Sequence, residues 1–81
     1  MAHYAELDEN NNVIYVVYIG NELITDNNGN EVEQLGIDYL HEHHGIHRKW
    51  VRTSYSGNFR DKYAGIGDYY NEENDRFESI S

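Results

Sequence analysis

The sequence predicts an α+β domain in which a small antiparallel sheet is packed by one helix, in the order ββαβ followed by a C-terminal hairpin. Residues Val13–Ile19 (VIYVVYI) are all β-branched or tyrosine, which is typical of a strand. Residues 31–44 place apolar side chains at helical spacing. Near the C-terminus, NEEND at 71–75 separates two short segments of strand character. A chain of 81 residues supports one small core, so residues 1–81 are expected to form a single domain.

The first two strands are expected to form a hairpin. His3–Leu7 alternates apolar and polar residues, and DENNN at 8–12 provides a turn before Val13–Ile19. Because Val13–Ile19 is apolar on both faces, we expect it at the centre of the sheet, or with one face under the helix and the other against a partner.

The helix is expected over residues 31–44. A turn at Asp26–Gly29 precedes it, and Asn30 is a good N-cap residue. Gly36 lowers the helix propensity but allows close packing against the sheet, and Gly45 is expected to end the helix.

The C-terminal half is expected to hold three strands. Lys49–Tyr55 alternates in the manner of a strand, and Ser56–Gly67, with three glycines, forms a structured connection. Asp68–Tyr70 and Arg76–Ile80 then form the second hairpin.

The charge is strongly acidic and unevenly distributed. The net charge is −9, yet residues 48–62 carry five basic residues and one acid. This balance argues against nucleic-acid binding, which depends on phosphate contacts. The central basic segment between acidic arms indicates charge pairing within the fold or between subunits. The chain has no cysteine, so neither a disulfide nor a cysteine metal site can support its thin core, and homo-oligomerisation is a common alternative.

No apolar run is long enough to span a membrane. The N-terminus lacks the basic and apolar regions of a signal peptide, so we expect a soluble protein that is intracellular at synthesis.

A band of aromatic and basic residues is the main candidate for a functional surface. Trp, Tyr and Arg dominate protein–protein hot spots, so the band is interpreted as an interface, with core packing and stacking of single-stranded bases as the alternatives. The predicted interface residues are Trp50, Arg52, Tyr55, Phe59, Arg60 and Tyr63.

Four histidines form the rival candidate, a metal- or ligand-binding site in a small regulatory protein. His41, His43, His44 and His47 lie in HEHHGIH. Imidazole binds zinc, nickel and copper, but the spacing is not that of H-E-x-x-H and no matched acid completes a site. An exposed helix end, where protonated histidine suits the helix dipole, is favoured over a metal site, and we expect neither a metal nor another cofactor.

Catalysis is not indicated. Carboxylates at 8–9 and 72–75 lie in turns, the serines occur in no G-x-S-x-G context, and the glycines form no phosphate-binding fingerprint. We therefore expect no catalytic residues and no enzymatic activity.

The blocks MAHYAELDENNNV, DNNGNEVEQLGI and WVRTSYSGNFRDKYAGIGDYY resemble a family of small proteins encoded by tailed, often marine, phages. The resemblance covers about residues 1–70. It departs at Ser56, where Asn is usual, at Asp68, where an aromatic is usual, and in lacking a proline-rich tail. It implies a virion or tail-associated structural protein or an assembly factor, made in the host cytoplasm, and it carries over no catalytic residues. Its partners would be itself, other virion proteins or host proteins, with an acidic host-takeover factor as an alternative role.

Overall fold

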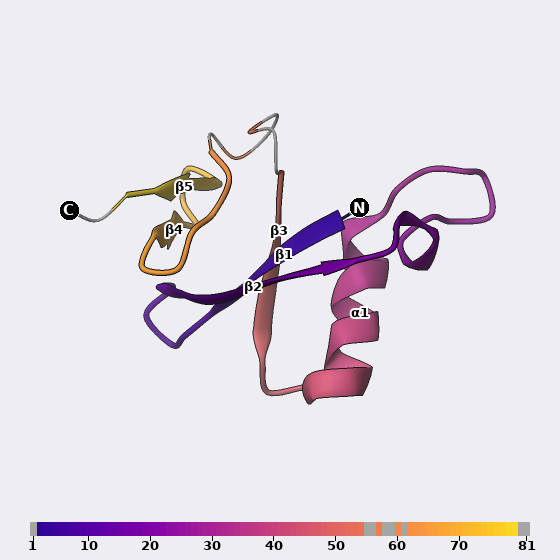
Figure 1. The fold of residues 1–81 in the computed structure, drawn as a ribbon, viewed down its shortest axis with the longest axis horizontal. Helices are drawn as coiled ribbons and strands as arrows, with labels where there is room; N and C mark the ends of the chain where they lie inside the picture. The colour runs from indigo at the N-terminus through magenta and orange to yellow at the C-terminus, as the bar shows by residue number, and fades with distance from the viewer. Residues whose placement is uncertain (1, 55–56, 58–59, 61, 80–81) are drawn as a thin grey trace.

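The computed structural model describes residues 2–54, 57, 60 and 62–79 and has three layers (Figure 1). A three-stranded antiparallel sheet lies between a helix on one face and a two-stranded hairpin on the other. The chain therefore has the predicted α+β fold, in which one helix packs on antiparallel strands.

The strands of the main sheet run in the order β2-β1-β3. Strand β1 (Ala2–Leu7) forms the predicted hairpin with β2 (Val13–Ile19) and also pairs with β3 (Lys49–Thr53). Of the two places expected for Val13–Ile19, the centre of the sheet is wrong, because β1 occupies the centre and β2 lies at an edge. Strand β3 ends at Thr53, before the predicted Tyr55, which lies outside the described residues.

The structure shows why the half-polar strand β1 can be central. Its Tyr4 ring is fully buried, and the Tyr4 hydroxyl donates a hydrogen bond to the Glu33 backbone oxygen at 3.0 Å. Its Glu6 is also buried and pairs with Arg48 at 3.0 Å. Both polar groups are satisfied by long-range contacts, which a pattern of alternating residues cannot reveal.

Helix α1 (Glu33–His44) begins two residues later than predicted. Val32 occupies the N-cap position without a side-chain hydrogen bond, so the prediction of Asn30 as the cap is wrong. Asn30 instead closes the preceding turn, because its N–H donates to Asp26 Oδ1 at 2.9 Å and its carbonyl accepts from the Asp26 N–H at 2.8 Å. The predicted end at Gly45 is confirmed, with a positive φ of 109° that suits glycine.

Gly36 is where the helix approaches the sheet most closely. A Cβ at this position would overlap the Tyr4 hydroxyl and ring. The predicted close packing of Gly36 against the sheet is therefore confirmed. The core on this face is a cluster of apolar residues from the sheet, the loop and α1, comprising Ala2, Tyr4, Ile19, Ile24, Leu40 and Trp50.

The opposite face of the sheet is covered by the C-terminal hairpin of β4 (Tyr69–Asn71) and β5 (Arg76–Glu78). This hairpin was predicted, although its strands are shorter or shifted by one residue. Its buried rings, Tyr70 and Phe77, pack with Ala5, Leu7 and Val51. A short 3-10 helix, η1 (Asn21–Leu23), lies in the loop that follows β2.

Within the part of the chain that the structure describes, no helix has the length and apolar character needed to cross a membrane.

Candidate functional site: the two edges of the sheet

The structure separates the residues of the predicted aromatic and basic band. Trp50 is only 4% exposed and belongs to the core beneath α1, where its ring lies 5.7 Å from that of His44. Arg52 and Arg60 are half-buried beside α1, whereas Tyr63 lies over the opposite face of the sheet, 5.5 Å from the His3 ring. Tyr55 and Phe59 lie outside the described residues. The interface role of this set stays a prediction.

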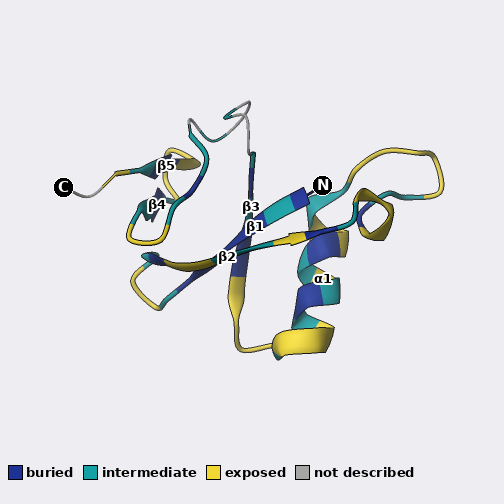
Figure 2. Cartoon of the chain, viewed as in Figure 1, coloured by how far each residue is buried: buried dark blue, intermediate teal, exposed yellow. Residues whose placement is uncertain are grey.

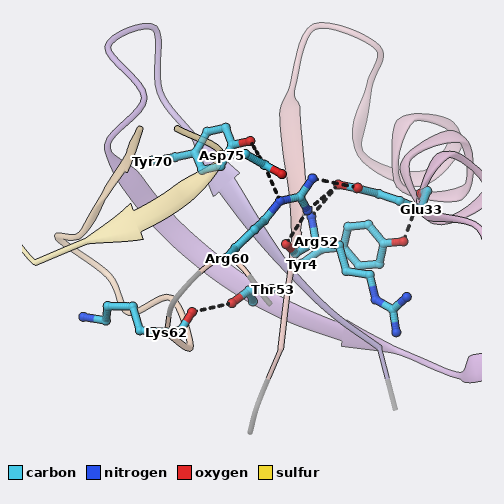
Figure 3. A network of polar contacts seen from close by, with 8 residues as sticks. All are labelled: Tyr4, Glu33, Arg52, Thr53, Arg60, Lys62, Tyr70 and Asp75. Carbon is cyan, nitrogen blue, oxygen red and sulfur yellow. Dashed lines mark hydrogen bonds and ion pairs between the residues drawn. The ribbon is translucent and has the colours of Figure 1, made fainter. Parts of the chain in front are cut away.

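Arg60 joins all three layers of the fold (Figure 3). Its Nη1 and Nη2 atoms donate to the two carboxylate oxygens of Glu33 on α1, each at 2.9 Å, and its Nε donates to Asp75 Oδ1 at 2.7 Å. Its guanidinium lies 5.8 Å from the centre of the Tyr70 ring. A bidentate guanidinium–carboxylate pair has a fixed geometry, so this contact orients α1 relative to the hairpin.

The backbone of Arg60 indicates that the side chain is needed at this position. Its φ of 56° lies in the left-handed region, which costs a residue with a Cβ roughly 1–2 kcal/mol. Its backbone oxygen also accepts a hydrogen bond from Phe77 N at 3.0 Å. Glycine would relieve the strain but would remove every side-chain contact to Glu33 and Asp75.

The same ion pair covers the outer edge of β3. Among the described strands, β3 pairs with β1 alone, and on its other side the Arg52 N–H donates to Glu33 Oε2 at 2.8 Å. The Arg52 carbonyl accepts from Arg60 Nη1 at 2.7 Å. Glu33 and Arg60 thus occupy the two backbone groups of Arg52 that a further strand would use. We call the outer side of β3 at Arg52 the sealed edge.

The electrostatics of this network follow from its burial and its ion pairs. The Tyr70 hydroxyl and Arg60 hold the pKa of Asp75 below its ordinary value. Burial, with Asp75 adding to it, raises the pKa of Tyr70 to about 12. Burial likewise raises the pKa of Tyr4 to about 12. Burial disfavours the charged form of Arg60, but the hydrogen bonds to Glu33 and Asp75 outweigh it and raise the pKa of Arg60.

All six basic side chains of the chain have partners within the fold. Arg60 forms the network described above, and Lys49 Nζ donates to Asn11 Oδ1. The other four basic side chains form ion pairs, which are Arg48–Glu6, Arg52–Glu31, Lys62–Asp68 and Arg76–Glu78. The basic segment is therefore balanced internally, and the charge presented outward is acidic.

The outer edge of β2 is different. Its first residue, Val13, is paired, since Val13 N donates to Asp68 O at 2.7 Å and Val13 O accepts from Gly67 N at 2.8 Å. From Ile14 to Ile19, no strand among the described residues pairs with this outer side. We call this stretch the open edge.

The open edge carries large apolar side chains on both faces of the sheet, and exposed positions recur along it (Figure 2). Tyr15 and Tyr18 are 55% and 64% exposed, and Ile14 is 46% exposed. Tyr15 pairs with Glu6 on the face that α1 covers, and Tyr18 pairs with His3 on the opposite face. A register shift at Ile14 forms a bulge opposite Glu6–Leu7.

Aromatic rings extend inward from the open edge on the hairpin face. The His3 ring lies 6.0 Å from the Tyr18 ring and 5.5 Å from the Tyr63 ring. On the helix face, an open pocket of about 410 Å³ lies beside the start of β2. Its lining includes Ile14 and Tyr15 together with Glu6, Asp8, Glu9 and Arg48. The open edge is thus flanked by surface on which a partner's side chains could pack.

The four clustered histidines do not share a site. His41 Nε2 lies 2.8 Å from the Arg48 backbone oxygen. The His43 ring is tilted against the Tyr39 ring at 4.3 Å, and the His44 ring is tilted against the Trp50 ring at 5.7 Å. Among the described residues, no three His, Asp or Glu side chains gather as metal ligands do.

Comparison of the chain with protein-family models, curated proteins and solved structures gives no significant match.

Sequence reasoning missed the partners that form the sealed edge. By sequence, Glu33 lies at the start of the predicted helix and Asp75 lies in the NEEND turn, and neither position indicates a partner. Arg60 lies 27 residues from Glu33 and 15 from Asp75, so no local spacing signals these contacts. The run of seven uncharged residues in β2 was the one signal that could have found the open edge.

Proposed function

We propose that this protein is a protein–protein interaction module that acts in assembly rather than catalysis, and that it binds through the open edge of β2. The observation that carries the proposal is the contrast between the edges. Glu33 and Arg60 cover the backbone of β3 at Arg52, whereas Ile14–Ile19 has no such cover among the described residues.

An exposed, uncharged edge strand is a template for another strand. Proteins that act as monomers usually protect such strands with lysine, proline or a covering loop. Strand β2 contains neither lysine nor proline, and its bulge lies at the end nearest the turn, so the rest of the edge is regular. Pairing of a partner strand would satisfy its backbone groups, and Tyr15 and Tyr18 would supply contact area on the two faces.

The proposed partners are a second copy of the chain or proteins of a virion or host, in line with the resemblance to small phage proteins. In that setting the protein is made in the host cytoplasm and either acts there in assembly or becomes part of the particle. A role in nucleic-acid binding is not proposed, because each basic side chain already has a partner within the chain.

The test is site-specific photo-crosslinking in cells that express the protein. A benzophenone amino acid replaces Tyr18 on the open edge, or Glu42 on the exposed side of α1 as the control. We expect a higher-mass product that depends on the position-18 probe, and mass spectrometry then identifies what it contains. If position 18 gives no more product than position 42, the proposed function is wrong.

A further inference from the structure

Building on the proposed function, we propose that the strand pairing with the open edge is β2 of a second copy of this chain. The two β2 strands run antiparallel about a two-fold axis perpendicular to the sheet. The two three-stranded sheets thereby join into one sheet in the order β3-β1-β2-β2-β1-β3. The sealed edges then form the two ends of the joined sheet, so assembly stops at a dimer.

The open edge is accessible to a second copy. Helix α1 packs against β3, at the other side of the sheet. The C-terminal segment makes backbone contacts at the start of β2, through the Asn12–Tyr69 bridge and the backbone bonds of Val13, and Val16 packs against the cluster that contains Tyr70 and Phe77. Val16, Val17 and Ile19 turn their side chains into the two cores. The outer backbone edge beyond Val13 nevertheless has no strand of either outer layer paired with it among the described residues.

The side chains of β2 match those of a second copy. A two-fold axis of this kind pairs residues that lie on the same face of the sheet. Tyr15 and Tyr18 lie on opposite faces, so Tyr15 never opposes Tyr18, and a tyrosine opposes its own copy only if the axis lies at that tyrosine. With the axis at Val16, Tyr15 faces Val17 and Tyr18 faces Ile14 of the second copy.

With the axis at Val17, Tyr15 faces Ile19 and Tyr18 faces Val16. Both registers therefore place every exposed tyrosine against a β-branched residue, which is a favourable cross-strand pair. Strand β2 contains no charged residue, so neither register brings like charges together along the open edge.

Charge favours a second copy over a basic partner strand at this edge. Residues Ile14–Ile19 offer no carboxylate for a partner's lysine or arginine to contact. Self-association also brings together two chains of net charge −9, which repel each other. Salt screens that repulsion, so the dimer should become tighter with salt, whereas a complex with a basic partner would weaken.

The main test is the solution mass of the purified full chain, measured by light scattering across a concentration series at about 50 mM and about 500 mM NaCl. We expect a monomer–dimer equilibrium whose dissociation constant falls at the higher salt concentration. Tyr18→Lys should raise the dissociation constant by at least about tenfold. Both copies of the dimer carry the substitution, so two cross-strand pairs are lost. Tyr15→Lys tests the other face in the same way.

The control is Glu42→Gln, which changes the net charge by the same amount on the exposed side of α1. It lowers the repulsion between copies, so it should leave the dimer unchanged or slightly tighter. Circular dichroism and urea unfolding check that each variant is folded. We expect the Tyr15 and Tyr18 variants to fold, because both side chains are exposed.

Single cysteines then locate the axis, because the chain has no cysteine of its own. Residues on the axis face their own copies at a separation that a disulfide can span. Under mild oxidation, either Val16→Cys or Val17→Cys should give a covalent dimer, and Glu42→Cys should not.

A monomer at both salt concentrations overturns the second-copy inference. If the position-18 probe then still captures another protein, the proposed function stands and only the identity of the partner changes. A dimer that weakens with salt, or that ignores both Tyr18→Lys and Tyr15→Lys, also overturns the inference, because another surface then holds the copies together. Loss of both the position-18 product and the β2-dependent dimer contradicts both proposals.

Discussion

The two edges of the sheet show opposite ways of treating exposed backbone groups. On β3, the Arg52 N–H and carbonyl are bound by Glu33 and Arg60, whose side chains are themselves paired. On β2, apolar side chains project beside a backbone edge that no described strand covers from Ile14 onward. Protection of the sealed edge therefore depends on tertiary contacts, because Glu33 of the helix, Arg52 of the strand and Arg60 of the following loop must come together.

The sealed edge should also be the more important one for stability. Its groups are partly buried, and each removed partner leaves a charge or a backbone group unsatisfied. The open edge carries exposed side chains, whose substitution changes the free energy of unfolding only slightly.

Removing the guanidinium at the centre of the sealed edge should have the largest effect. Arg60→Leu leaves Glu33, Asp75 and the Arg52 carbonyl without their shared donor. We expect the free energy of unfolding to fall by about 2–3 kcal/mol. Urea unfolding followed by the fluorescence of the single tryptophan, Trp50, measures it.

Two further variants show whether the loss comes from the fork geometry of Arg60. Arg60→Lys keeps the charge but cannot bind both Glu33 oxygens and Asp75 together, so it should recover only part of the stability. Arg76→Leu breaks an exposed pair with Glu78 and should cost at most about 1 kcal/mol. Equal effects of Arg60→Leu and Arg76→Leu would mean that the sealed edge adds no special stability.

The approach of α1 to the sheet should be the next most sensitive feature, because it places Glu33 beside β3. Gly36→Ala gains helix propensity but forces a methyl group into the Tyr4 hydroxyl. We expect the overlap to dominate, with a net loss of about 1–3 kcal/mol. Glu42→Ala, at an exposed position of the same helix, should be neutral or slightly stabilising in the same urea experiment. If Gly36→Ala were stabilising, the close contact between α1 and β1 would be wrong.

The sealed edge should also weaken in acid. Because the pKa of Asp75 is lowered in the folded state by Tyr70 and Arg60, its contribution is present above its ordinary pKa of about 3.9 and is lost as pH falls toward the lowered value. Asp75→Asn removes this contribution, and Asn tolerates the positive φ of 52° at this position. The variant should be less stable than the wild type near neutral pH, and the difference should shrink below about pH 4.

Urea midpoints measured across this pH range check the prediction. Asp8 and Glu78 also have lowered pKa values, through hydrogen bonds from Asn12 and Asn71 respectively. The variant should therefore keep part of the acid sensitivity. If the difference in stability between the wild type and Asp75→Asn does not change with pH, the charge of Asp75 does not contribute to stability.

The smallest effect on the monomer is expected at the open edge. Tyr18→Lys, at a protein concentration low enough to keep the chain monomeric, should change the free energy of unfolding by no more than about 0.5 kcal/mol. The Tyr18 ring is 64% exposed, so little apolar contact is lost. A large loss of monomer stability would indicate that Tyr18 supports the fold through His3 rather than serving as contact surface.

Local patterns were sufficient for the elements but not for their arrangement. The β-branched run, the helical spacing before Gly45 and the NEEND turn predicted the hairpins and the helix close to their observed bounds. The same run misled about position, because an apolar strand was expected at the centre and instead forms an edge. Asn30 misled in a similar way, since a good capping residue can equally close a turn.

The candidate site was only partly predictable, for a physical reason. The sequence identified Arg60 as a residue of interest but interpreted it as contact surface, because nothing near it in the chain shows its partners. Trp50 was interpreted in the same way and lies in the core.

The sequence by itself determined the strands, the helix, the acidic balance and the uncharged character of Val13–Ile19, because these depend on neighbouring residues or on composition. Only the tertiary structure decided the strand order, the burial of Tyr4 and Glu6, and the division into a sealed and an open edge. Those features depend on contacts between distant residues, such as Arg60 with Glu33, Tyr4 with Glu33 and Arg48 with Glu6, which are 27, 29 and 42 positions apart. Such contacts form when the layers pack, and no periodicity along the chain encodes them.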